Sequence, residues 1–188
     1  ILFRGQALWL PPLFLFVLTP IMDQLLGLKR NVLEGDDALR KPRDLRYDLW
    51  LYAWVPAQLA LQVMALVLAA QADFWGFMGL AFAAGMLGGI GINVGHELMH
   101  RRGVPERALA EVLLTSVSYT HFCVEHVLGH HRHVSTALDP ASARLGEPLQ
   151  TFWVRSIVGG VRSAWRLERS RVAKLGIPLG LRDRRVRY

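Results

Sequence analysis

The stretch FWGFMGLAFAAGMLGGIGINVGHELMH, residues 74–100, decides the fold of this chain. Its first 22 residues carry no charged side chain, which is about the length that an α-helix needs to cross a hydrocarbon core of roughly 30 Å. Its last five residues place His96 and His100 four positions apart, so a helix presents both on one face. The stretch therefore predicts a transmembrane helix that ends at a candidate metal site.

Two other apolar stretches precede this one. Of the 188 residues, 52% are hydrophobic, which is high for a soluble protein. Residues 49–70 contain two glutamines as their main polar interruption, and residues 7–28 contain an aspartate and a glutamine near their end. We therefore predict an all-α fold, a multi-pass bundle of transmembrane helices with spans at about 7–28, 49–70 and 74–95.

The charges between these spans predict the orientation of the chain. Residues 29–48 carry six Lys and Arg side chains, whereas the short link at residues 71–73 carries none. Under the positive-inside rule the long loop is cytoplasmic, and the span at 74–95 then returns to the cytoplasm. The histidines that follow this span are therefore predicted to face the cytoplasm.

A second histidine group, HVLGHH at residues 126–131, follows a predicted helix at residues 106–125. His126 and His130 repeat the four-residue spacing, while His131 points in a neighbouring direction and can reach a second ion. Neutral imidazole suits iron, zinc, copper and nickel, and a catalytic zinc normally takes only three protein ligands. Two metal ions are therefore the better hypothesis. The candidate ligands are His96, His100, His126, His130 and His131.

Three carboxylates near these groups are candidates for orienting the imidazoles, and they are Glu97, Glu125 and Asp139. The alternative is that each is a solvated or capping carboxylate. The sequence HELMH also matches the HExxH pattern of zinc peptidases, in which the glutamate is the general base. Three further histidines exceed what such a peptidase needs. His121, His133 and the single cysteine, Cys123, are interpreted as ordinary packing or surface residues.

The net charge of +7 is concentrated toward the C-terminus, where residues 144–188 carry eleven Lys and Arg against three Asp and Glu. Within this region, residues 151–175 combine arginines on one side of a predicted helix with apolar side chains on another. This basic amphipathic pattern is typical of a helix that lies on an anionic membrane surface. Beside three predicted spans, it gives little support to nucleic-acid binding.

Several segments together resemble a known family, the membrane alkane monooxygenases of the membrane desaturase and hydroxylase superfamily. HELMH at 96–100 and EHVLGHH at 125–131, followed by DPASAR at 139–144, resemble the first two histidine boxes of that family. WLPPLF at 9–14 and the segment 159–168 are also similar, so the resemblance covers most of the chain. The second box is its most specific part, because membrane desaturases usually have two residues, not three, between the leading histidine and the histidine pair.

The resemblance implies a non-haem di-iron enzyme, an alkane 1-monooxygenase, which inserts one oxygen atom of O₂ into the terminal C–H bond of a medium or long alkyl chain. It implies the five candidate histidines as iron ligands, with no catalytic residue besides the metal ligands, and rubredoxin as the electron donor. It also implies a place in the bacterial inner membrane. The alternatives are a fatty acyl desaturase or hydroxylase of the same superfamily, and a non-catalytic metal-binding membrane protein.

The family's third histidine box and one further histidine have no counterpart here, and the chain begins with Ile1 rather than methionine. We therefore expect residues 1–188 to be part of a longer di-iron oxygenase domain.

Overall fold

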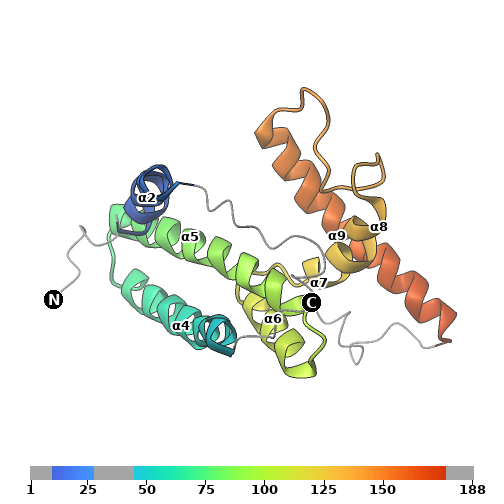
Figure 1. The fold of residues 1–188 in the computed structure, drawn as a ribbon, viewed down its shortest axis with the longest axis horizontal. Coiled ribbons are helices and arrows are strands. Elements are labelled where there is room, and N and C mark those ends of the chain that lie inside the picture. Colours follow the sequence, from blue (N-terminus) through green and yellow to red (C-terminus); the bar gives the residue numbers. More distant parts are fainter. Residues whose placement is uncertain (1–9, 28–44, 177–188) are drawn as a thin grey trace. The chain divides into compact units, whose positions relative to one another are not determined.

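The computed structural model describes residues 10–27 and 45–176, and the regular elements within them are helices (Figure 1). These described residues contain no strand, which confirms the all-α prediction for this part of the chain. The contacts divide the protein into two compact units, residues 1–98 and 99–188, and each unit has its own arrangement of helices.

The first unit begins with an apolar helix that contains a π-helical turn. Its consecutive segments are α1 (Leu10–Leu13), η2 (Phe14–Leu18) and α2 (Thr19–Leu26). The backbone N–H and the hydroxyl of Thr19 both donate to the carbonyl oxygen of Phe14, five residues earlier. The helix Leu10–Leu26 falls within the predicted span 7–28, whose ends lie outside the described residues, and it is shorter than the two helices that follow.

Two long apolar helices, α4 (Leu45–Ala69) and α5 (Phe74–Met99), form a hairpin in the first unit (Figure 1). Both are long and apolar enough to cross a membrane. α5 contains the predicted span 74–95, and α4 contains residues 49–69 of the predicted span 49–70. Each helix also continues beyond its predicted span through charged residues. The carboxylate of Asp73 caps the start of α5 by accepting from the Gly76 N–H at 2.8 Å.

The two helices of the hairpin meet at Gln58 of α4 and Gly91 of α5. Gln58 is fully buried, and its Oε1 accepts a hydrogen bond from Trp54 Nε1 at 2.8 Å. A Cβ atom at Gly91 would lie only 1.9 Å from that oxygen, whereas Gly85 and Gly89 face open space. Of these three glycines, only Gly91 is therefore needed for close approach of the helices.

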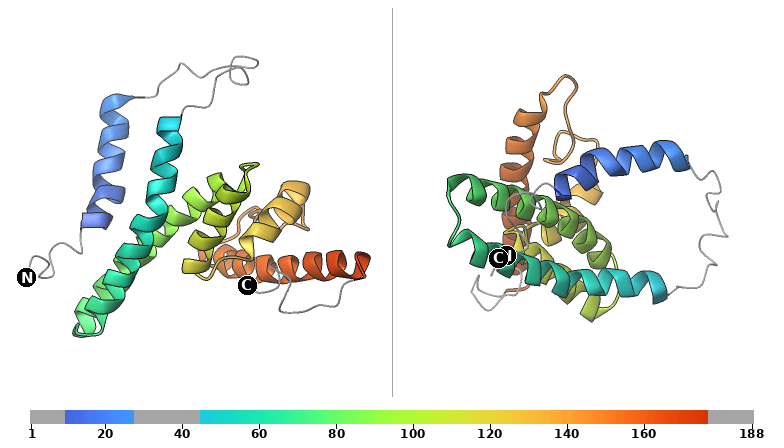
Figure 2. Two further views of the ribbon diagram at one scale, coloured as in Figure 1. Left: turned by 90° about the horizontal axis from the view of Figure 1, so that it is seen from below. Right: turned by 90° about the vertical axis from the view of Figure 1, so that its left-hand side faces the viewer.

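The second unit packs a short, interrupted helix against a long one. Its elements are α6 (Val104–Ser116), α7 (Phe122–Glu125), η3 (His126–His130), α8 (His131–His133) and α9 (Leu149–Lys174). The run from α7 through α8 is continuous, and α7 and η3 pack against α9, beside which they lie in Figures 1 and 2. The buried side of α9 includes Gly160, Ala164 and Val172.

The predicted single helix at residues 106–125 is wrong in its middle. α6 ends at Ser116, and the chain turns before α7 begins at Phe122. Ser118 has a φ of 56°, a left-handed conformation that an α-helix cannot contain. This turn lets the histidine-bearing helix change direction and pack against α9.

The loop between α8 and α9 is fastened to α9 by Arg155. The Arg155 guanidinium donates to both carboxylate oxygens of Glu147, at 2.6 and 2.7 Å. It also donates to the backbone oxygens of Pro140, at 3.1 Å, and Ser142, at 2.8 Å. One side chain of α9 thus fixes the middle and the end of this loop.

Candidate metal centre

A π-helical turn carries the second histidine group. η3 spans His126–His130, between the α-helical turns of α7 and α8. A π-turn closes its hydrogen bonds one residue later than an α-turn, and such turns are frequent at functional sites. Residues five apart, and not only residues four apart, therefore come to face each other here.

Three imidazole rings of the second unit converge around His126. The Nε2 atom of His126 lies 3.0 Å from Nε2 of His131 and 3.3 Å from Nε2 of His100. The rings of His100 and His131 stack, with centroids 4.9 Å apart and planes 6° apart. The side chain of His131 is therefore directed to the same point as that of His126. The expectation that His131 points in a neighbouring direction assumed an α-helix, and the π-helical turn changes that direction.

His130 is held differently, through Asp139. Its Nδ1 lies 2.9 Å from Asp139 Oδ2, while its ring stacks on that of His126 with centroids 5.1 Å apart. A carboxylate bound to Nδ1 holds the proton there and leaves Nε2 as the nitrogen able to bind a metal. Asp139 is almost fully buried and also accepts hydrogen bonds from the Ser142 hydroxyl and the Ala141 N–H. Burial acts to raise the pKa of Asp139, but these two hydrogen bonds and the one with His130 outweigh it. The net result is a lowered pKa, so the carboxylate is charged.

Glu125 is also buried, but its carboxylate lies beside Gly129 of η3 and not beside a histidine nitrogen as that of Asp139 does. Its Oε1 atom has no hydrogen-bond partner among the described residues, and a Cβ atom at Gly129 would lie 2.4 Å from it. Burial, and secondarily the charge of Asp139, raise the pKa of Glu125. Gly129 is thus required for space beside this carboxylate.

The first pair, His96 and His100, stands at the end of α5, where the boundary between the two units falls. His96 belongs to the first unit. It precedes His100 by four residues, about one helical turn, and side chains at this spacing lie on the same helix face. Glu97 is exposed on the same turn.

Cys123 and His121 lie near the cluster and take no part in the convergence described above. Burial raises the pKa of the Cys123 thiol to about 11, so this cysteine is a neutral packing group at physiological pH. A Cβ atom at Gly160 of α9 would lie 3.7 Å from His121 Nε2, so this ring lies beside α9, and its burial lowers the pKa of His121. Both observations agree with their interpretation as packing residues.

The chemistry of the three convergent imidazoles fits a transition-metal ion. A neutral imidazole nitrogen is either a donor or a single-lone-pair acceptor, so His126 Nε2 cannot make a good hydrogen bond with both of its neighbours at once. A cation between the rings would satisfy all the lone pairs directed at it. His100 and His126 are also members of a group whose potential ligand atoms lie within 4.8 Å of one another. Nitrogen donors favour iron, zinc, copper or nickel over calcium or magnesium.

Two helices that are long and apolar enough to cross a membrane, together with a cluster of histidines that could hold a metal ion, are typical of membrane-bound metal enzymes. Comparison with known families agrees. Residues 73–188 match the family described as fatty acid desaturase, and the chain belongs to this family.

Within that family the chain is similar to alkane monooxygenases. It is 33% identical to alkane 1-monooxygenase 1 of Alcanivorax borkumensis over 176 residues, which cover 92% of this chain and 44% of that protein. It is 35% identical to alkane 1-monooxygenase of Pseudomonas putida over 159 residues, covering 84% and 40% respectively. It is 36% identical to alkane 1-monooxygenase 1 of Pseudomonas aeruginosa over 171 residues, covering 87% and 44%. The chain therefore spans less than half the length of these relatives.

Proposed function

We propose that the protein is an alkane 1-monooxygenase, which hydroxylates the terminal carbon of medium or long alkanes at a centre of two non-haem iron ions. The observation that carries this proposal is the convergence of the Nε2 atoms of His100, His126 and His131 in a chain similar to proteins of that name. Bound iron would supply the activation of O₂, chemistry that protein side chains do not provide.

The described residues have distinct roles in this proposal. His100, His126 and His131 would hold metal through Nε2, and His130 would do so through its own Nε2 because Asp139 occupies Nδ1. We include His96 as the fifth ligand on the basis of its spacing from His100. Asp139 holds the proton of His130 and fixes the plane of its ring. The Phe122 ring, 4.6 Å from that of His126, shields one side of the cluster from water.

We further propose that α4 and α5 cross the bacterial inner membrane and that the metal centre faces the cytoplasm. Most of their apolar side chains are exposed in the structure, as expected for helices whose surroundings are lipid. An alkane dissolved in the bilayer can then enter from the membrane, while O₂ diffuses in freely. A soluble donor, rubredoxin in this proposal, delivers electrons from the cytoplasmic side.

A second candidate, supported by the family match, is a desaturase or hydroxylase of fatty acyl chains. It would use the same histidines and the same membrane placement. The two candidates differ in their product, because a terminal alcohol of the alkane itself arises only from the alkane reaction, and a cis double bond or a hydroxylated fatty acid only from a reaction on acyl chains.

The test is gas chromatography of alkane-fed cells that express the full natural chain or its variants. We expect terminal alcohol from the unaltered protein, no detectable alcohol from His131→Ala, and nearly normal alcohol from His133→Ala, with equal protein levels in the membranes. Normal alcohol from His131→Ala would overturn the ligand assignment. Desaturated fatty acids without alcohol would favour the second candidate, and retained iron without any O₂-dependent product would indicate a non-catalytic protein.

A further inference from the structure

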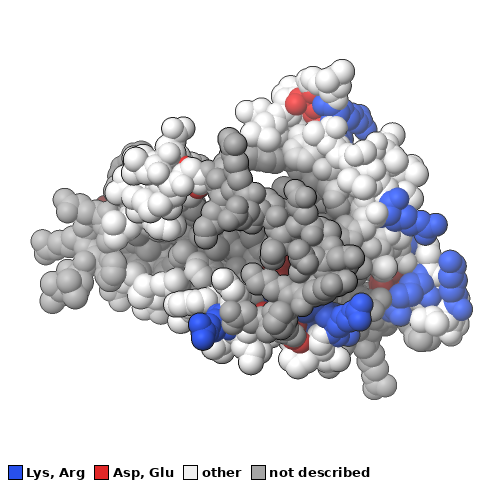
Figure 3. Space-filling model, viewed as in Figure 1, with Lys and Arg blue, Asp and Glu red and all other residues white. Residues whose placement is uncertain are grey.

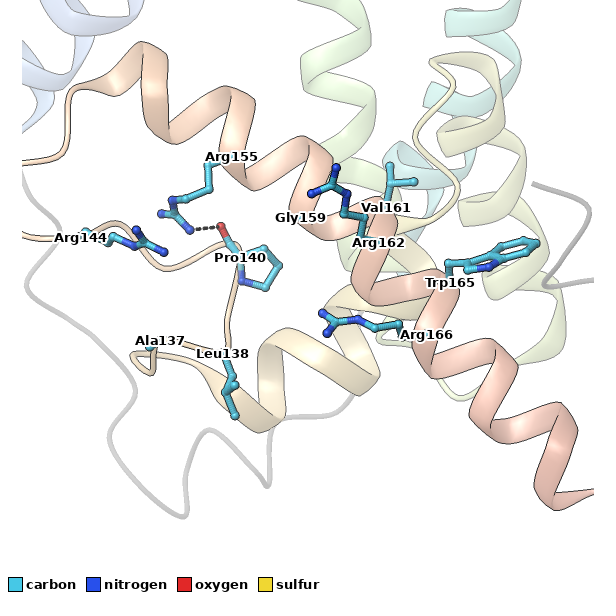
Figure 4. Close-up of a pocket in the computed structure, with 10 residues that line it drawn as sticks. All are labelled: Ala137, Leu138, Pro140, Arg144, Arg155, Gly159, Val161, Arg162, Trp165 and Arg166. Carbon is cyan, nitrogen blue, oxygen red and sulfur yellow. Dashed lines mark hydrogen bonds between the residues drawn. The ribbon is translucent and has the colours of Figure 1, made fainter.

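A surface cavity of about 670 Å³ lies between α9 and the loop that precedes it (Figure 4). Four arginines surround it, with an exposed tryptophan and an exposed leucine beside them. These six lining residues are Arg144, Arg155, Arg162, Arg166, Trp165 and Leu138. None of the residues that line the cavity is acidic.

The arginines of α9 form one stripe along the helix. Arg155, Gly159, Arg162 and Arg166 follow one another at intervals of four, three and four residues, so they share one face. In Figure 4 the side chains of this stripe extend around the space between α9 and Pro140, and Arg144 reaches the same space from the loop. Figure 3 shows several Lys and Arg side chains over the part of the surface that contains α9, and others elsewhere on the molecule.

The charge of this stripe is only partly neutralised. The charge of Arg155 is neutralised by Glu147, and this guanidinium also donates to the loop carbonyls, as described above. The guanidinium groups of Arg162 and Arg166 make no hydrogen bond or ion pair with any residue that the structure describes. Like charges held around one cavity repel each other, and an anion placed between them relieves that repulsion.

Gly159 gives the cavity its inner wall. A Cβ atom at Gly159 would lie 2.7 Å from Cβ of Pro140, so the absence of a side chain lets the loop approach α9. Together with the four hydrogen bonds of Arg155, this contact holds Pro140 and Arg144 in place around the cavity. The cavity is therefore bounded by anchored backbone and not only by flexible side chains.

Apolar side chains border the arginine stripe on its outer side. Val154, Val158, Val161 and Trp165 follow α9 at intervals of four, three and four residues, and all are exposed. Leu138, at the mouth of the cavity, is 71% exposed. A ligand with an anionic head and an apolar body matches these neighbouring stripes, and tryptophan is favoured where lipid headgroups meet water.

We propose that this cavity binds the phosphodiester of an anionic membrane lipid, with Arg162 and Arg166 as its principal partners and Arg144 as a third. Planar guanidinium groups bind phosphate oxygens in pairs, which a single lysine cannot do. The apolar stripe accommodates the glycerol and the first acyl carbons. This site is separate in its chemistry from the histidine cluster, and it does not depend on the proposed oxidation of alkanes.

The test measures thermal stabilisation of the full natural chain, purified in detergent, by added ligands. The probes are a short-chain phosphatidylglycerol, a short-chain phosphatidylcholine, inorganic phosphate and poly-L-glutamate. We expect saturable stabilisation by phosphatidylglycerol and much weaker effects of the others. The variant Arg162→Gln/Arg166→Gln should weaken phosphatidylglycerol binding about tenfold or more, since each arginine near an anionic lipid contributes on the order of 1 kcal/mol.

The control is Arg107→Gln/Lys174→Gln, which removes the same charge from exposed positions outside the cavity. It should bind phosphatidylglycerol as the unaltered protein does. Equal weakening by both double variants would show a general charge effect and would overturn the site. Equally tight binding of inorganic phosphate would assign the cavity to a free anion, and tighter binding of poly-L-glutamate would assign it to an acidic protein. Both results would contradict the lipid proposal.

The substituted arginines are exposed, so the unliganded melting temperature should not change. If it falls, Arg166→Lys provides a second variant that keeps the charge and loses the paired geometry. We expect the Arg166→Lys variant to bind phosphatidylglycerol severalfold more weakly than the unaltered protein does. Unchanged binding would contradict the role of Arg166. None of these measurements uses iron or catalytic turnover, so the failure of the proposed enzymatic function would leave their outcome unaffected.

Discussion

The Nε2 atoms of His126 and His131 lie 3.0 Å apart, although the two residues are separated by five positions and not by four. In a regular α-helix, residues five apart point to different sides. The π-turn of η3 brings them together, and His100, which follows α5, joins the same cluster. His126 is the central member, because its Nε2 atom lies 3.0 and 3.3 Å from the other two Nε2 atoms and its ring also stacks on that of His130.

Replacing His126 should therefore abolish metal binding more completely than replacing any neighbouring histidine. We expect His126→Ala, in the full natural chain, to lower the iron content of the purified protein by about tenfold or more, since the central donor is lost. Iron is measured by mass spectrometry of the metal against protein concentration. His133→Ala is the control and should retain normal iron, and an iron content in His126→Ala equal to that of the control would disprove the central role.

Among the candidate ligands, Asp139 contacts His130, so we expect it to affect metal affinity through that histidine. We expect Asp139→Asn to weaken metal affinity by about 10- to 100-fold, the usual effect of losing a carboxylate that orients a ligand imidazole. Competition with a chelator measures this affinity. Glu147→Gln disturbs the same loop without touching His130, so it should change the affinity little. If both variants weaken binding equally, the integrity of the loop and not the His130 contact is responsible.

The close contact between α4 and α5 predicts opposite effects at two neighbouring glycines. Gly91→Ala should lower the free energy of unfolding by about 1–3 kcal/mol, because the new methyl group displaces Gln58 from its bond with Trp54. Gly89→Ala meets no neighbour and should be neutral or raise stability by roughly 0.5–1 kcal/mol through helix propensity. Unfolding of the detergent-purified protein in increasing dodecyl sulfate measures both. Equal destabilisation by the two variants would argue against the contact.

The Glu147–Arg155 pair predicts a stability difference that depends on pH. The hydrogen bonds from Arg155, with help from Arg144, lower the pKa of Glu147 from about 4.5 to about 2. A carboxyl group whose pKa is lower in the folded than in the unfolded protein stabilises the fold fully at pH values above its unfolded pKa. This stabilisation is lost progressively as the pH falls toward the folded pKa of about 2. The melting temperature of the unaltered protein should therefore exceed that of Glu147→Gln at pH 6, and the difference should shrink between pH 5 and pH 3. A difference that is constant over this range would refute the ionic contribution of the pair.

The features that could be predicted from the sequence were those that depend on local composition. Long uncharged runs indicated the apolar helices α4 and α5, and their ends were misplaced only because charged residues continue the helices. Histidine spacing identified the residues that converge in the second unit. These signals are local, since hydrophobicity and spacing are properties of neighbouring residues.

What the sequence could not indicate depends on contacts between distant residues. The π-turn at His126–His130 packs against α9, and no residue in HVLGHH distinguishes it from an α-turn. The break at Ser118 inside the predicted helix is likewise not marked in the sequence, since residues 115–121 contain neither glycine nor proline. The four hydrogen bonds of Arg155 join residues 8–15 positions apart, so the arginine would otherwise be counted with the exposed charges of α9.

An extra residue in an α-helix normally rotates everything after it by about 100° about the helix axis. If only two residues stood between the leading histidine and the histidine pair, an α-turn would suffice to bring those side chains together. Here three residues intervene, and the wider turn of η3 cancels the rotation. Motifs that appear different when histidines are counted along the sequence can thus be geometrically equivalent, provided that the turn widens when the motif lengthens.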